Sequence, residues 1–279
     1  MNNREIEVVK KTRPYWHVDA KWICGLLFLF FFGLTVFFFN LYKITERSSA
    51  IEASTHFLAA LFSPDGIDSS RDIEKIRSDF SANPGKELRP FPGLDIVVTE
   101  EDLDGSPREL RLNLFRQLAT PIYDTGELAG KVDTNGAEQE QSLDIGMLKF
   151  ISSQSHHTIR VVLIVLSIVS FLLLAGLVLF SFGVGRLVSP GIIILILSIP
   201  GLAISFFLKT ISNKPFPLES LNSESFMPKI SYIASLVLPI LVGVVYENYL
   251  VLTILGASLL ILSLIIKIVL SSRSNNAPN

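Results

Sequence analysis

The last third of the chain, from Ile159 to Leu270, is almost continuously apolar. A water-soluble core divides its apolar residues into periodic stripes, whereas these runs approach the ~20 residues that a helix needs to cross the hydrocarbon of a bilayer. Polar or turn-forming residues interrupt the block at Gly183–Pro190, Lys209–Lys229 and Tyr246–Tyr249. The block predicts an integral membrane protein of the all-α class, built on a bundle of transmembrane helices.

The interruptions and an earlier apolar run set the number of predicted spans. The spans are predicted at 22–43 and at about 159–182, 190–208, 230–246 and 250–270. Residues 229–270 are too many for one span of ~20 residues, so a tight hairpin is predicted at Tyr246–Tyr249. Five spans place the polar tail, residues 271–279, outside the cytoplasm.

A four-span arrangement is the alternative. Five spans leave Lys209, Lys214, Lys229, Lys267 and Arg273 on the outer side and Arg186 alone in the inner loops, against the usual excess of basic residues in cytoplasmic segments. Four spans, with residues 230–245 as a re-entrant segment, return Lys267 and Arg273 to the cytoplasm. The length of the apolar run favours five spans over four.

The N-terminal residues 1–21 are basic, with five lysines and arginines against three acidic residues. Because cytoplasmic flanks of spans carry an excess of positive charge, this segment is predicted to be cytoplasmic. The apolar run that follows is longer than the about 7–15 residues of a secretory signal peptide. An uncleaved signal-anchor is therefore favoured over a cleaved signal, and we expect the protein in the plasma membrane.

Residues 44–158, here called the inserted region, form the one long polar segment and are predicted to be an extracytoplasmic domain. They contain twenty acidic and eleven basic residues. Such a surface repels phosphate groups, which disfavours nucleic acid or anionic lipid as its partner. A protein partner is the remaining expectation for this acidic domain.

The inserted region is predicted to be small and mainly helical. Its clearest signal is Ser106, Pro107 and Glu109, which supply an N-cap, a first-position proline and a capping-box acid for a helix. The glycine-rich stretch 124–137 is predicted to be a loop. A further helical stripe is predicted from residue 139 through residue 157 into the second span.

Charged residues inside a span are the usual sign of a functional site in a membrane protein, because burying them in hydrocarbon costs several kcal/mol. Every lysine, arginine and glutamate of the apolar block lies at a predicted span end, which disfavours an ion-coupled transporter. Pro200, Gly201 and Pro239 lie near the middle of two spans, where broken helices can form a substrate site. Ordinary kinks are the favoured interpretation. Glu247, in the predicted turn, is interpreted as a solvated acid rather than a gate.

His156 and His157 stand at the outer end of the second span. Adjacent helical residues point about 100° apart, so the two imidazoles cannot ligate one metal without distortion. Interfacial polar residues are therefore favoured over a metal site. Cys24 is the only cysteine, which excludes an intramolecular disulfide. No cofactor or catalytic residue is predicted.

The chain carries no motif that identifies an enzyme or a family. We expect a non-enzymatic interaction or accessory protein that acts through its acidic extracytoplasmic domain. A channel or carrier for a lipid or apolar solute, with its path through the helical bundle, is the alternative. An enzyme embedded in the membrane is a third, less favoured class, and the oligomeric state is left open.

Overall fold

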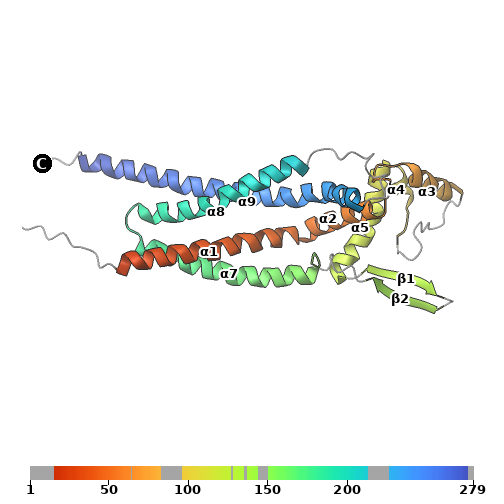
Figure 1. The fold of residues 1–279 in the computed structure, drawn as a ribbon, viewed down its shortest axis with the longest axis horizontal. Coiled ribbons are helices and arrows are strands. Elements are labelled where there is room, and N and C mark those ends of the chain that lie inside the picture. Colours follow the sequence, from red (N-terminus) through yellow and green to blue (C-terminus); the bar gives the residue numbers. More distant parts are fainter. Residues whose placement is uncertain are drawn as a thin grey trace, which may run out of the picture. The chain divides into compact units, whose positions relative to one another are not determined.

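The computed structural model describes residues 16–63, 65–82, 96–126, 128–134, 137–143, 150–212 and 226–275, and helices dominate it (Figure 1). Four described helices are long and apolar enough to cross a bilayer: α1 (Trp16–Ile44), α7 (Ser153–Phe180), α8 (Gly185–Ser212) and α9 (Phe226–Asn275). Large apolar side chains are exposed along all four, a surface that suits a bilayer rather than water. The helices indicate a membrane protein.

A short turn joins α7 to α8. Gly183 has a φ of 52°, a left-handed conformation that glycine adopts without strain. The backbone N–H of Gly185 then donates to the Phe182 carbonyl at 2.9 Å. As a result α8 begins at Gly185, earlier than the start at residue 190 that the sequence predicts.

The predicted hairpin at Tyr246–Tyr249 is wrong, because α9 runs through these residues without a break. The segment contains no glycine or proline, so its backbone chemistry does not end a helix. Two of its polar side chains also contact other helices. The Asn248 amide donates to the Asn40 side-chain oxygen at 2.8 Å, and the Lys209 ammonium lies 4.6 Å from the centre of the Tyr246 ring. Within the described residues there are four candidate spans, not five.

The apolar part of α9 is longer than one span. It contains 42 residues, Lys229–Leu270. At about 1.5 Å per residue this is roughly 63 Å of helix, against ~30 Å of hydrocarbon. Residues 230–245 are the first half of this continuous helix, and so they do not form the re-entrant segment of the four-span alternative.

The chain divides into two compact units, each described separately. The first comprises Met1–Thr35, Val165–Ile199 and Val251–Asn279. Small residues bring its helices close: a Cβ on Gly176 would lie 3.2 Å from the Cys24 sulfur, and the Thr35 and Ser170 hydroxyls are 2.9 Å apart. Such contacts are the usual means of packing helices in a membrane, where apolar surface alone does not drive helices together.

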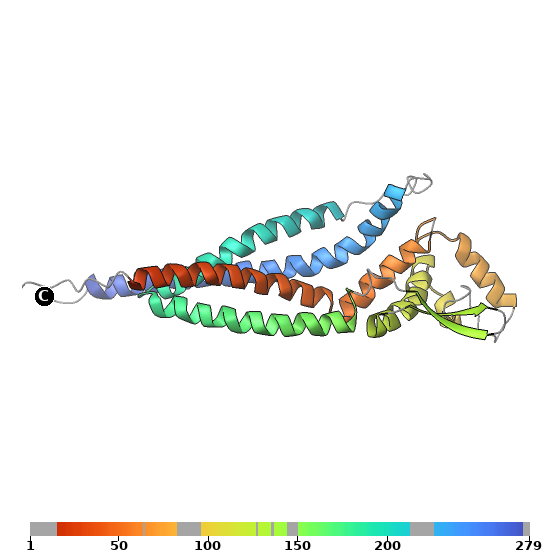
Figure 2. The ribbon, with the colours of Figure 1, turned by 60° about the horizontal axis from the view of Figure 1, so that its bottom comes forward.

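The second unit comprises Val36–Ile164 and Pro200–Leu250. The described elements of the inserted region are α2 (Arg47–Leu61), α3 (Arg71–Ala82), α4 (Glu100–Leu103), α5 (Pro107–Thr125), β1 (Leu128–Thr134) and β2 (Ala137–Leu143). Helices α2 and α5 pack against each other (Figure 2). The region is mainly helical, as the sequence predicts.

The predicted start of α5 is confirmed. The Ser106 hydroxyl accepts from the Glu109 backbone N–H at 3.3 Å, and the Glu109 carboxylate accepts from the Ser106 backbone N–H at 2.8 Å. These hydrogen bonds from Ser106 lower the pKa of the Glu109 carboxyl. The helix ends before Gly126, whose φ of 77° terminates it in the left-handed conformation.

The core of the inserted region lies between α2, α3 and α5 and is completed by α9. Its most buried large side chains are Leu58, Ile67, Ile73, Ile96, Leu110, Leu114 and Phe115. Tyr232 of α9 is 5% exposed, and its hydroxyl oxygen accepts from the Ile67 backbone N–H at 2.7 Å. The guanidinium of Arg111, also buried, donates to the carbonyl of Ile67 at 2.6 Å. The inserted region therefore folds around a helix that also supplies a candidate span.

The loop predicted at 124–137 and the helix predicted from residue 139 are wrong. Strands β1 and β2 form an antiparallel hairpin in which Leu128 pairs with Leu143 and Thr134 with Ala137, and α7 begins only at Ser153. The sequence between the strands is Asn-Gly, the pair most typical of a tight hairpin turn. The strands are mostly polar, so the apolar alternation that usually indicates a strand is weak here.

Candidate functional site

Four side chains meet where α1 ends and α2 begins, and we call them the junction cluster: Tyr42, Thr45, Tyr123 and His156. They come from α1, from the turn after it, from α5 and from α7. The Thr45 hydroxyl lies 3.0 Å from Nδ1 of His156, and the Tyr42 ring stacks on the imidazole with 4.5 Å between ring centroids. The cluster joins the inserted region to two candidate spans.

The hydroxyl of Thr45 has one proton and three possible acceptors. Besides His156, it lies 2.9 Å from the Leu41 carbonyl oxygen and 3.2 Å from the Tyr42 carbonyl oxygen. When the proton goes to the nearest of these, the Leu41 carbonyl, Nδ1 of His156 must carry a proton and donate to Thr45. In that tautomer Nδ1 of His156 orients the turn as a hydrogen-bond donor to Thr45.

Tyr123 supplies a second hydrogen bond to this turn. Its hydroxyl donates to the Thr45 carbonyl at 3.2 Å. Burial, followed by the neighbouring charge of Asp124, raises the pKa of the Tyr123 phenol above its ordinary value. The phenol is therefore protonated at neutral pH and available as the donor.

The junction cluster does not have the accessibility that nucleophilic catalysis requires. Thr45 is 4% exposed and Tyr123 is 7% exposed, so a substrate cannot reach either hydroxyl. No group of three or more His, Cys, Asp or Glu that could hold a metal occurs among the residues that the structure describes. The cluster is best understood as a polar joint between the inserted region and the membrane helices.

The other predicted positions lie in regular helix. Pro200 and Gly201 are within α8, and Pro239 is within α9. A Cβ on Gly201 would overlap the ring of Tyr249, so this glycine permits close packing between α8 and α9. That packing accounts for the glycine without a broken helix.

The remaining two candidates, Glu247 and His157, are both exposed. Glu247 is a helical residue of α9, which corrects its placement in a turn. His157 lies in the first turns of α7 beside His156, and only His156 is part of the junction cluster. Tertiary contacts thus distinguish two adjacent histidines for which the sequence predicts the same role.

A charged groove lies on the surface of α2 and α5, and the sequence analysis did not identify it. It has a volume of about 580 Å³ and is lined by Glu46, Arg47, Ser48, Ile51, Glu52 and Arg116. Arg47 pairs with Asp124 at 3.4 Å, whereas Glu52 and Arg116 form no ion pair with any residue that the structure describes. A signal for it was available, because residues 46, 47 and 52 are charged positions at the start of a helix whose later residues are mostly apolar.

Comparison with known proteins assigns the chain to no family. No family model, curated protein or solved structure matches it significantly. Function must therefore be inferred from the residues of this chain.

Proposed function

We propose that the protein is a membrane-anchored interaction protein without catalytic activity, which binds a protein partner through the inserted region. The observation that supports this most is the charged groove on α2 and α5. Its carboxylates and guanidiniums suit a polar segment of another protein, because complementary charges select a partner and guide its approach. Glu52 and Arg116 are the groove charges available for that role.

The groove is built on a rigid support, which favours binding over a passive surface role. Ile51 lines the groove and also packs against the core, where Leu58 of α2 and Leu114 and Phe115 of α5 are at most 1% exposed. A surface whose backbone is held in shape by such a core loses less conformational entropy when a partner binds than a flexible segment does. The junction cluster and Tyr232 further connect this support to the helices that continue as candidate spans.

We further propose that four spans place the inserted region outside the cytoplasm. With four crossings, the segments before the first span, between the second and third, and after the fourth share one side. Lys21, Arg186 and Lys267 lie in or beside these segments, as does the basic N-terminal segment. The positive-inside tendency assigns that side to the cytoplasm and returns Lys267 and Arg273 to it, whereas Lys209, Lys214 and Lys229 stay on the outer side.

Labelling of single cysteines tests this topology. Because Cys24 is the only cysteine, Cys24→Ser provides a background for Ser70→Cys in the inserted region and Ser272→Cys near the end of α9. An impermeant maleimide applied to intact cells should label the first variant, and should label the second only after lysis. Labelling in the opposite order would contradict the proposed orientation, and equal labelling of both in intact cells would contradict four spans.

Photo-cross-linking from the groove tests the function. A photoreactive amino acid at Ser48, inside the groove, should capture a partner in native membranes, whereas one at exposed Ser78 of α3 should not. Glu52→Arg should lower the captured yield several-fold, because it inverts a groove charge. Glu74→Arg makes the same change on exposed α3 surface and should preserve the yield. Recovery of the uncross-linked monomer alone from the Ser48 variant would contradict the proposal.

A further inference from the structure

A pocket in the first unit lies between α1 and α8, and Leu177 of α7 also lines it. Its volume is about 360 Å³, and its walls are the apolar side chains of Leu26, Leu29, Ile192, Ile193 and Ile196 beside Gly25. Gly25 has no side chain, and the nearest atoms to a Cβ built there are Leu177 Cδ1 at 3.6 Å and Ile193 Cδ1 at 4.0 Å. The pocket is thus an apolar channel on helices whose outward faces suit lipid.

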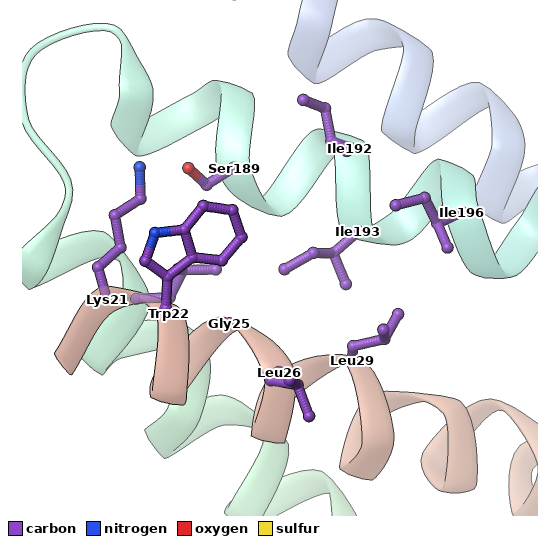
Figure 3. Close-up of a pocket in the computed structure, with 10 residues that line it drawn as sticks. Lys21, Trp22, Gly25, Leu26, Leu29, Ser189, Ile192, Ile193 and Ile196 are labelled. Atoms are coloured by element: carbon purple, nitrogen blue, oxygen red, sulfur yellow. The ribbon is translucent and has the colours of Figure 1, made fainter. Parts of the chain in front are cut away.

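One end of this pocket is polar. Figure 3 shows Lys21, Trp22 and Ser189 together at that end, with the isoleucines of α8 and Leu26 and Leu29 of α1 extending away from them. The Lys21 ammonium, the Trp22 indole N–H and the Ser189 hydroxyl make no hydrogen bond or ion pair with the residues that the structure describes. All three can donate a hydrogen bond, and one carries a full positive charge.

This arrangement matches one class of molecule. An acyl chain fits the apolar channel, and a phosphate at its end would accept from the ammonium, the indole and the hydroxyl. Lys21 and Trp22 also line a smaller neighbouring pocket of about 280 Å³ with Phe180 and Phe182, so the polar end is open enough for a headgroup. Basic residues between membrane helices on the cytoplasmic side are the known chemistry for anionic headgroups. Tryptophan near a span end belongs at the same depth.

We propose that this pocket is a binding site for an anionic phospholipid, with one acyl chain between α1 and α8 and the phosphate at Lys21. The site differs from the acidic inserted region, which repels anionic lipid, because its only charged lining residue is a lysine. It does not depend on the partner-binding role proposed above. Its occupant would fill the space between the two helices and hold them at their present separation.

Quenching of Trp22 fluorescence by brominated lipid tests the site. The chain has two tryptophans, so Trp16→Phe leaves Trp22, which is 74% exposed, as the single reporter. The protein is reconstituted in phosphatidylcholine vesicles with about one-fifth phosphatidylglycerol, and either the anionic lipid or an equal amount of phosphatidylcholine carries brominated chains. Brominated phosphatidylglycerol should quench as if enriched more than about fivefold at Trp22, because about fivefold is the preference expected for one basic residue at a membrane surface without a pocket.

Three variants in the Trp16→Phe background test which residues the preference for anionic lipid depends on. Lys21→Gln should reduce the enrichment to near unity, and Lys267→Gln, the same change on an exposed lysine of α9, should preserve it. Gly25→Leu should lower it to at most the surface level of about fivefold, because the new side chain fills the channel while leaving Lys21 in place. Equal quenching by the two lipids in the parent would overturn the proposal, as would enrichment that survives Lys21→Gln. Enrichment that Gly25→Leu leaves unchanged would indicate surface attraction and would overturn the pocket as the binding site.

Discussion

Gly201→Leu is expected to destabilise the packing of α8 on α9 by about 3 kcal/mol or more, the upper range for overpacked cores. Even a Cβ at this position would overlap the Tyr249 ring, and a leucine adds three further carbons to the overlap. Relief of this overlap requires the Tyr249 ring to leave its rotamer or α8 and α9 to separate, and both changes cost free energy. The measurement is the unfolding midpoint of the detergent-solubilised protein, followed by tryptophan fluorescence against denaturant.

Two further substitutions test whether Gly201→Leu destabilises the protein through its contact with the Tyr249 ring. Gly243 lies in α9, and a Cβ there would have no atom within 4 Å, so Gly243→Leu should change the midpoint little. Tyr249→Ala removes the ring and, combined with Gly201→Leu, should restore much of the stability that Gly201→Leu loses, which makes the two changes non-additive. Equal midpoints for Gly201→Leu and Gly243→Leu would show that the close approach is not required.

The sequence predicted those elements whose signal is local. Continuous apolar runs predicted the candidate spans, because hydrocarbon requires long helices with few charges. Ser106 and Glu109 predicted the start of α5, because both partners of the capping box lie within one turn of helix. Each of these features depends on residues close together in the chain.

The elements that the sequence did not predict depend on contacts between distant residues. Tyr246–Tyr249 resembles a turn in composition but remains helical, and the partner of Asn248 is a residue of the first span. His156 cannot be distinguished from His157 until Thr45 and Tyr42 are placed beside it. The lipid pocket likewise requires α1 and α8 to be adjacent, which no local pattern shows.

The length of α9 also changes which of its residues we expect to cross the bilayer. The apolar residues around Tyr232 resemble a span by composition, yet Tyr232, Ile233 and Leu236 pack against the core of the inserted region. A helix of roughly 63 Å can serve both purposes, because only about half of it fits in hydrocarbon. We therefore expect the half from residue 250 onward to cross the bilayer, and the half before residue 246 to stabilise the inserted region.

Tyr232→Ala is the test of this division, with an expected loss of about 3–5 kcal/mol in the stability of the inserted region. The substitution leaves a cavity in the core and removes the acceptor of the Ile67 N–H, which is fully buried. Hydrogen exchange of the α5 amides should accelerate by about a hundredfold or more, since every ~1.4 kcal/mol is a factor of ten. Tyr232→Phe, which keeps the ring and removes the hydroxyl, should show a smaller acceleration because about 1–3 kcal/mol is lost.

Leu238→Ala provides the matched control on the same helix. Leu238 is 41% exposed and lies outside the core that Tyr232 completes, so its truncation should leave exchange in α5 nearly unchanged. If Tyr232→Ala also left exchange in α5 unchanged, the inserted region would fold without α9, and residues 230–246 would again be candidates for a separate span. If exchange in α5 accelerates only for Tyr232 variants, the first half of α9 belongs to the inserted region. A partner bound at the charged groove could then influence the membrane helices through α9 itself.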